Sequence, residues 1–137
     1  MGMSGAFAAM FTPYDAKGRV DAETIARIMD YGYANGLKGF YLTGTTGEWW
    51  LLSTDERRQV YAAAAKANRG RGRLIAHVGA NCTDDSVTLA RYAADIGIDC
   101  GWFRKPFEPL TAAQYKAYAK RFAAMGIDDR RVRLRDD

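Results

Sequence analysis

The sequence predicts an α/β fold built from parallel strand-helix units, and two observations carry this prediction. Short apolar segments alternate with longer segments whose apolar residues recur at helical spacing, and this order repeats four times within 137 residues. One unit occupies roughly 30 residues, the length that a parallel strand-helix-strand repeat requires. Such units build either an open, doubly wound sheet or a closed barrel, and periodicity alone leaves both architectures open.

The first unit begins with an apolar strand over residues 5–11, which Thr12-Pro13 ends. Asp21 then caps a helix, since an aspartate before the first periodic residue can accept from free backbone amides. Asn35-Gly36 ends this helix, as a left-handed cap would. The helical spacing is carried by Ile25, Ile28, Met29 and Tyr33.

The next three units follow the same order. The expected strands cover residues 39–42, 74–78 and 99–103. Residues 53–56 form a capping box of serine and glutamate that opens the second helix. Thr83 or Asp84 is expected to cap the third helix, which Gly97 closes. A second capping box at 111–114 opens the fourth helix.

Composition excludes several classes of protein. Hydrophobic residues make up 48% of the chain and charged residues 26%, a normal globular mixture. The apolar runs are far shorter than the roughly 20 residues that span a bilayer. The first residues lack the basic start and long apolar stretch of a signal peptide. We therefore expect a cytoplasmic protein with no membrane partner.

Metal, cofactor and nucleic-acid sites find no support in the motifs. Cys82 and Cys100 have no paired spacing, and the chain has one histidine, so both cysteines are expected to be small core residues. Neither a GxGxxG motif nor a Walker loop occurs, so no nucleotide cofactor is expected. The net charge of +4 comes largely from arginine runs at 69–73 and 129–135. A glycine-broken loop and a tail with aspartates favour solvated segments over nucleic-acid binding.

The segment that can carry chemistry is the loop Gly44-Thr45-Thr46-Gly47-Glu48, which follows the second strand and precedes a capped helix. Functional loops of parallel α/β folds lie at the carboxyl ends of strands. Glycines allow the backbone to approach a ligand closely, and hydroxyls with free amides suit a small anion such as a carboxylate. The alternative is a tight turn in which Thr45 and Thr46 cap the local backbone.

This loop, with the following Leu52-Ser53 and Glu56-Arg57, resembles the signature of the dihydrodipicolinate synthase and N-acetylneuraminate lyase family. Other segments fit the same register: Thr12-Pro13-Tyr14-Asp15 after the first strand, residues 75–79 in the third, and Pro106 after the fourth. The resemblance extends from residue 5 to about residue 125, and the combination is more specific than any one segment.

The resemblance implies a (β/α)8 barrel of the TIM-barrel type that performs class I aldolase or dehydratase chemistry on 2-oxo acids such as pyruvate. In this family a lysine on strand six forms a Schiff base with the keto acid, which is nucleophilic catalysis by an amine. A tyrosine on strand five transfers protons. By the motif, Thr45, Thr46 and Gly47 bind the substrate carboxylate and Thr45 relays a proton, while Glu48 is expected to be a structural hydrogen-bond partner.

The sequence departs from this pattern because strands five and six have no counterpart in it. Residues 1–126 are interpreted as the N-terminal half of an aldolase-type barrel, truncated before the catalytic lysine, and 127–137 as an irregular arginine-rich tail. Lys105, at the end of the fourth strand beside Arg104, is the candidate nucleophile that can point toward the site, the alternative being a solvated loop lysine. The other lysines are expected to be solvated: Lys17, Lys38, Lys66, Lys116 and Lys120.

Further departures narrow the expectation. Phe107-Glu108 stands where dihydrodipicolinate synthases carry a tyrosine pair, which favours a sugar-acid dehydratase or aldolase relative. Trp49-Trp50 is expected to be a hydrophobic seal rather than a wall of the site, and His77 a hydrogen-bonded interior residue within the third strand.

Half a barrel leaves sheet edges and an apolar sheet face uncovered. We therefore expect a homo-oligomer or a complementing C-terminal half. Two hypotheses remain: a Schiff-base lyase whose other half comes from elsewhere, and a non-catalytic remnant that binds small carboxylates.

Overall fold

The computed structural model describes residues 4–98, 113, 116, 117 and 120 of the chain. The chain divides into two units, Met1–Gly101 and Trp102–Asp137, and each is described by itself. In the second unit the described residues are helical and exposed, at positions within the helix expected after residue 111: Ala113, Lys116, Ala117 and Lys120. The expected fourth strand, Cys100 and the tail at 127–137 lie outside the described residues.

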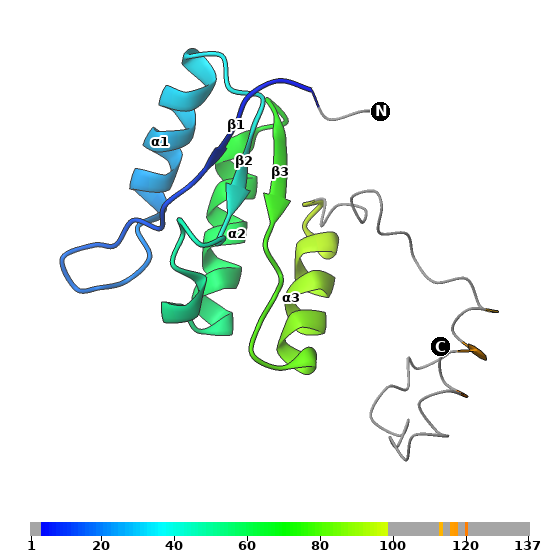
Figure 1. Cartoon of the computed structure of the whole chain (residues 1–137). Coiled ribbons are helices and arrows are strands. Elements are labelled where there is room, and N and C mark those ends of the chain that lie inside the picture. Colours follow the sequence, from blue (N-terminus) through cyan, green and yellow to red (C-terminus); the bar gives the residue numbers. More distant parts are fainter. Residues whose placement is uncertain (1–3, 99–112, 114–115, 118–119, 121–137) are drawn as a thin grey trace. The chain divides into compact units, whose positions relative to one another are not determined.

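The first unit contains a parallel sheet whose strands lie in the order β1-β2-β3 (Figure 1). The strands are β1 (Phe7–Ala9), β2 (Gly39–Leu42) and β3 (Arg73–Ala76). Both pairings are parallel, so the α/β class with parallel units is confirmed for the described residues. β1 is shorter than the expected 5–11, and β3 ends before the expected residue 78. At the carboxyl ends of both strands, the physical reason lies in β2, which ends at Leu42 because Thr43 turns into a left-handed conformation.

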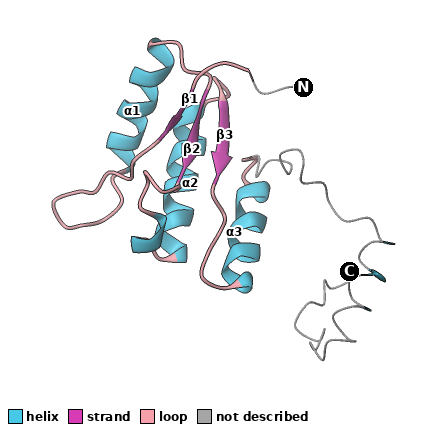
Figure 2. Ribbon diagram, in the orientation of Figure 1, coloured by secondary structure: helices cyan, strands magenta, loops and turns pink. Residues whose placement is uncertain are grey.

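Three helices cover the sheet: α1 (Ala22–Ala34), α2 (Thr54–Asn68) and α3 (Thr83–Asp95), as Figure 2 shows. The Asp21 carboxylate accepts from the amides of Glu23 and Thr24, each at 3.0 Å, as expected of an N-cap. The capping box of Ser53 and Glu56 is present in both directions. These two helix starts were predictable because a capping side chain acts on amides within three residues of itself.

The expected cap of the third helix is wrong. The capping position falls on Cys82, whose side chain makes no capping hydrogen bond, and Thr83 is already helical. Ser86 closes this turn instead, because its hydroxyl accepts from the Ala80 amide at 3.0 Å and donates to the Cys82 carbonyl at 3.1 Å. Cys82 is also exposed, so the expectation of a small core residue is wrong for it. The side chain at the first turn of a helix points to solvent unless another element packs over it.

The core lies between the sheet and the helices. Phe40 and Leu42 of β2 are fully buried, and α1 packs on α2, which packs on α3. Consecutive parallel strands with right-handed crossovers place successive helices on the same face of the sheet. This single winding differs from a doubly wound sheet, in which the strand order reverses, and it is the arrangement that barrels repeat. The buried core is formed mainly by Ile25, Met29, Phe40, Leu42, Val60, Tyr61, Ala64, Leu74, Leu89 and Ala93.

The arginine-rich connection at 69–73 is part of the fold rather than a free basic patch. Arg69 ends α2 in a left-handed conformation. Arg71 forms an ion pair of 2.6 Å with Asp30 and lies over the Tyr33 ring, 4.7 Å from its centroid. Its guanidinium also donates to the Ala67 carbonyl at 2.7 Å. These contacts tie the loop to α1 and α2. Among the helices that the structure describes, none combines the length and apolar character needed to cross a bilayer.

Candidate functional site

The loop at residues 44–48 is a tight turn at the carboxyl end of β2. The Gly47 amide donates to the Gly44 carbonyl at 3.1 Å, and the Glu48 amide donates to the Thr45 carbonyl at 3.0 Å. A short 3₁₀ helix, η1 (Trp49–Leu51), follows and leads into α2. The loop is therefore closed by its own backbone before the capped helix begins.

Thr43 opens this turn in an unusual conformation. Its φ is 48°, a left-handed value that is a genuine outlier for a β-branched residue. The residue is 1% exposed, and its hydroxyl lies 3.1 Å from the Tyr61 hydroxyl and 3.2 Å from the His77 carbonyl. The left-handed turn breaks the alternation of β2, so Thr43 faces the helix layer as Leu42 does. Strain of this kind persists where the surroundings hold it.

The two glycines of the loop are required by close approach. A Cβ on Gly47 would lie 3.0 Å from both the Met10 carbonyl oxygen and the Thr43 Cα atom, which are backbone atoms. A Cβ on Gly44 would lie 2.3 Å from the Tyr41 ring. The buried Thr12 hydroxyl donates to the Gly47 carbonyl at 2.8 Å and so ties the segment after β1 to the loop.

Thr45 and Thr46 lie at the exposed tip of this pinned turn. Among the residues that the structure describes, neither hydroxyl has a hydrogen-bond partner, so the alternative in which they cap the local backbone is not what the structure shows. As far as the described residues go, both hydroxyls are open to an external acceptor or donor. Both threonines stay predicted carboxylate-binding residues. Gly47 is buried, its amide donates to the Gly44 carbonyl and its carbonyl accepts from Thr12, so its part in binding stays a prediction to which the structure adds no free donor.

Beneath the loop lies a buried polar cluster, defined here as Thr43, Arg57, Tyr61 and His77. The Arg57 side chain is 2% exposed and donates to the Gly79 carbonyl at 2.8 Å and to the His77 carbonyl. The Tyr61 hydroxyl donates to the same His77 carbonyl at 2.6 Å. Among the described residues, the His77 carbonyl after β3 is therefore satisfied mainly by side chains of α2.

His77 follows β3 rather than lying within it, which corrects the expected position. Its Nδ1 lies 3.0 Å from the Thr43 carbonyl oxygen, and because a carbonyl can only accept, Nδ1 carries the proton and donates. Burial lowers the pKa of the imidazole below its usual value, and the nearby Arg57 guanidinium lowers it further. The expected hydrogen bonding of His77 is found, but the side chain is half-buried rather than interior.

The tryptophan pair divides between two roles. Trp49 is half-buried, with its ring centroid 5.4 Å from that of His77 and 5.7 Å from the Arg57 guanidinium carbon, so it covers the polar cluster. Trp50 is 52% exposed, and the expectation of a seal is wrong for this residue. A 3₁₀ turn advances each residue by about a third of a turn, so neighbouring side chains cannot share one face.

The Glu48 side chain makes no hydrogen bond to any described residue, so its expected role as a structural hydrogen-bond partner stays a prediction. It is exposed and stands in a left-handed conformation with a φ of 55°. Its charge acts at a distance on Tyr14, whose pKa is raised by burial first and then by Glu48 and Glu56.

None of the described lysines lies in the buried cluster or on the loop. Each one is exposed: Lys17, Lys38, Lys66, Lys116 and Lys120. Lys105, together with Arg104, Pro106 and Phe107-Glu108, lies outside the described residues. Its role as nucleophile stays a prediction.

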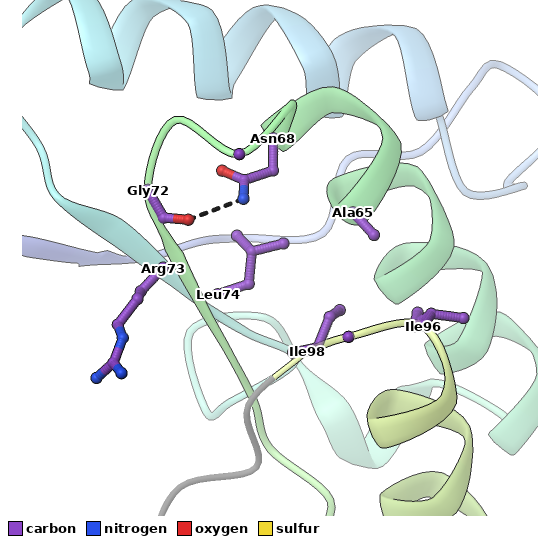
Figure 3. A pocket seen from close by; sticks show the side chains of 9 residues that line it. Ala65, Asn68, Gly72, Arg73, Leu74, Ile96 and Ile98 are labelled. Atoms are coloured by element: carbon purple, nitrogen blue, oxygen red, sulfur yellow. Dashed lines mark hydrogen bonds between the residues drawn. The ribbon is translucent and has the colours of Figure 1, made fainter. Parts of the chain in front are cut away.

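A separate pocket of about 370 Å³ lies at the opposite end of the sheet. Figure 3 shows it between the end of α2, the start of β3 and the residues after α3, with the Asn68 side chain bonded to the Gly72 carbonyl at 2.8 Å. Leu74, Ile96 and Ile98 line it with apolar surface. Because functional loops gather at the carboxyl ends of parallel strands, this pocket is not part of the candidate site.

Sequence reasoning missed Arg57 and Tyr61 as parts of the site. A signal was present, since Arg57 shares its helix face with Val60, Tyr61 and Ala64 at spacings of three, four and seven residues, and these are core residues. A charged residue on an apolar helix face indicates a buried polar partner. The identity of that partner could not be deduced, because it lies at the end of another strand.

Comparisons with known proteins show which family the chain is similar to. A sequence model described as the Dihydrodipicolinate synthetase family matches residues 2–128. The 4-hydroxy-tetrahydrodipicolinate synthase of Bacillus velezensis is 36% identical over 117 residues, which cover 82% of this chain and 40% of that protein. The N-acetylneuraminate lyase of Danio rerio is 36% identical over 130 residues, covering 92% of this chain and 42% of its own length.

Among solved structures, the N-acetylneuraminate lyase of Proteus mirabilis superposes with a TM-score of 0.68 at 33% sequence identity. The match covers 91% of this chain and 43% of that one. The chain thus spans about two fifths of the length of the relatives that it matches.

Proposed function

Because the chain belongs to the dihydrodipicolinate synthetase family, whose relatives are class I aldolases and lyases, we propose that it forms the carboxylate-binding part of a lyase acting on a small 2-oxo acid such as pyruvate. The proposed architecture is half of a TIM-type (β/α)8 barrel over residues 1–126. Thr45 and Thr46 bind the substrate carboxylate with Gly47, and Thr45 also relays a proton.

The observation that carries this proposal is the contrast between the pinned loop and its free hydroxyls. The backbone is fixed at Thr43, Gly44 and Gly47, while Thr45 and Thr46 project from the turn with no partner among the described residues. A site whose backbone is fixed before the ligand arrives loses less conformational entropy on binding. Two hydroxyls and the adjacent amides match the acceptor oxygens of a carboxylate.

The reaction also requires an amine. In the proposed chemistry, a lysine nitrogen attacks the keto carbon and water leaves as the Schiff base forms. The described lysines are all exposed, so the amine comes either from Lys105 or from a segment that this sequence does not include. An amine becomes nucleophilic at neutral pH when burial or a neighbouring cation lowers its pKa, and Arg104 can be that cation for Lys105.

The two arms of one experiment test binding and chemistry separately. Pyruvate is titrated into the isotope-labelled chain while the amide signals of Thr45 and Thr46 are followed by NMR. We expect both signals to move in the native chain. In the double variant Thr45→Val, Thr46→Val, the amide signals of positions 45 and 46 should stay fixed. Unmoved signals in the folded native chain would disprove the binding role.

In the second arm, the chain is incubated with pyruvate and borohydride, and the intact mass is measured. A stable adduct that disappears in Lys105→Met would identify Lys105 as the nucleophile. No adduct, together with shifted threonine signals, would favour the second candidate function, a chain that binds small carboxylates without catalysis.

We further propose that the chain associates, either with a second copy or with a complementing C-terminal half. Large apolar side chains after β1 and β2 are exposed, namely Phe11 at 54%, Trp50 at 52% and Leu51 at 66%. Exposed apolar surface of this kind favours protein contacts. Sedimentation equilibrium should give a mass above that of one chain, and a compact monomer at all concentrations would contradict self-association.

A further inference from the structure

We infer that Arg57 is the positioning residue of the candidate loop: it holds the carbonyls of His77 and Gly79 and, through His77, fixes Thr43 in the turn that directs Thr45 and Thr46 outward. This inference rests on the proposed carboxylate-binding role of the loop and deepens it. We infer that Arg57 acts through the loop and does not contact the substrate.

The charge of Arg57 is buried. Arg57 lies on α2 at 2% exposure, and none of the ion pairs among the described residues involves it. Its Nε atom is buried and has no hydrogen-bond partner among the described residues. A buried guanidinium without a carboxylate is costly, and an apolar side chain would fill the same space at lower cost. Packing alone therefore does not explain an arginine here.

The two terminal nitrogens of Arg57 point at backbone carbonyls after β3. One terminal nitrogen donates to the Gly79 carbonyl at 2.8 Å, and the other donates to the His77 carbonyl. Both carbonyls belong to residues that follow β3, and neither bonds to a strand among the described residues. A planar guanidinium with a fixed fork of donors can join two such carbonyls in one geometry, which a flexible ammonium does less well. Arg57 therefore sets the path of the chain after β3.

His77 connects the segment after β3 to the candidate loop. His77 donates from Nδ1 to the Thr43 carbonyl at 3.0 Å, and its amide donates to the Leu42 carbonyl at 3.0 Å. The Thr43 hydroxyl lies within hydrogen-bond distance of the Tyr61 hydroxyl and the His77 carbonyl. Thr43 is thus held at its carbonyl and at its side chain by groups that Arg57 fixes. These contacts maintain the left-handed φ of 48° at Thr43. Gly44 and Thr45 are the next residues of the chain, so their direction depends on this conformation.

The candidate loop also covers the buried polar cluster. Trp49, which ends the turn, lies 5.7 Å over the Arg57 guanidinium and 5.4 Å from the His77 ring. A cation over an indole face is attracted to it, and more strongly when water is excluded. The two ends of the loop, Thr43 and Trp49, therefore both contact the cluster that Arg57 organises.

The test uses His77 as an internal probe, because it is the chain's single histidine and gives one imidazole signal in NMR spectra. Among the described residues, the groups that face it are Arg57, Tyr61, the Thr43 carbonyl and the rings of Tyr41 and Trp49. In the full chain we compare Arg57→Met and Arg57→Lys with Arg58→Met as the matched control. Arg58 is the next residue on α2 and lies over the Tyr92 ring, 4.6 Å from its centroid.

We expect Arg57→Met to raise the His77 pKa toward its usual value, to shift the amide signals of Thr45 and Thr46, and to weaken pyruvate binding about tenfold, the order of one lost charge-assisted hydrogen bond. Arg57→Lys should restore part of the His77 pKa and part of the affinity. Arg58→Met should change none of the three readouts.

A folded Arg57→Met chain with native threonine signals would overturn the inference. If the native chain does not bind pyruvate, the proposed function fails, while the threonine and His77 signals still decide the role of Arg57. If Arg57→Met does not fold, Arg57→Lys and Tyr61→Phe decide: threonine signals that move in both variants support the inference, and native signals in both contradict it.

Discussion

The hydroxyl of Thr12 donates a 2.8 Å hydrogen bond to the backbone carbonyl of Gly47, across 35 residues of sequence. Thr12 is 5% exposed, so this bond forms away from water and fixes the candidate loop to the segment after β1. Together with the cluster beneath Thr43, it holds the loop at both ends. The rigidity of the loop therefore comes from two separate elements of the fold.

Removing this bond should loosen the loop. We expect Thr12→Val to lower the free energy of unfolding by about 1–3 kcal/mol, because the buried Gly47 carbonyl is left without a partner. Thr12→Ser keeps the hydroxyl and should cost less. Urea denaturation of the two variants measures the difference, and equal losses would show that the methyl group, not the hydrogen bond, stabilises this contact.

The close packing of Gly47 gives a second prediction. Gly47→Ala places a Cβ 3.0 Å from two backbone atoms, and overpacking of this kind costs roughly 1–3 kcal/mol. It should also reduce the NMR response of Thr45 and Thr46 to pyruvate. Gly97→Ala is the control, since its Cβ meets no atom within 4 Å and only its φ of +76° is strained. That variant should lose stability and keep the response.

His77 predicts a pH dependence of stability. Its pKa is lowered in the folded chain, so between the folded value and the usual value of about 6.5 the unfolded chain binds more protons. The stabilisation is therefore complete above about pH 6.5 and is lost as the pH falls through the folded pKa. His77→Asn, which can still donate to the Thr43 carbonyl, should flatten this part of the curve. An unchanged slope in thermal unfolding between pH 5 and 7, about the range in which histidine titrates, would contradict the assignment.

Removing a side chain at the start of a helix should cost stability at α2 but not at α3. Ser53→Ala removes a side chain that accepts from the Glu56 amide and should cost about 1 kcal/mol. Thr83→Ala at the start of α3 should change the free energy of unfolding by less than about 0.5 kcal/mol, because Thr83 is not the capping residue. Equal costs at both sites would contradict the observed helix starts.

The N-cap position of α3, Cys82, is a site where a substitution should stabilise the protein. Cys82 has the extended backbone of an N-cap, with φ of −134° and ψ of 157°, and lacks a capping side-chain bond. Cys82→Asp supplies a carboxylate that can accept from the free amides, and we expect a gain of about 0.5–1 kcal/mol. Cys82→Ala is the matched control and should give no gain. Chemical denaturation of both variants tests whether the gain comes from the cap.

The sequence anticipated the elements of the first unit well where the determinants are local. The Asp21 cap, the capping box of Ser53 and Glu56 and the strand over 39–42 were all predictable, because each depends on residues within a few positions of one another. The ends of β1 and β3 were not, since they depend on where a neighbouring strand turns. The failed cap at residue 83 shows the same limit at a helix start.

By itself, then, the sequence determined the parallel strand-helix order and the loop with two glycines and two hydroxyls, because periodicity and turn chemistry are written in neighbouring residues. Only the tertiary structure decided that Arg57 and Tyr61 of α2 meet His77 after β3, and that Thr12 reaches Gly47. These contacts join residues 16 to 35 positions apart. Hydrogen bonds between separate elements form only once the hydrophobic core has set the distance between sheet and helices, and no local pattern encodes that distance.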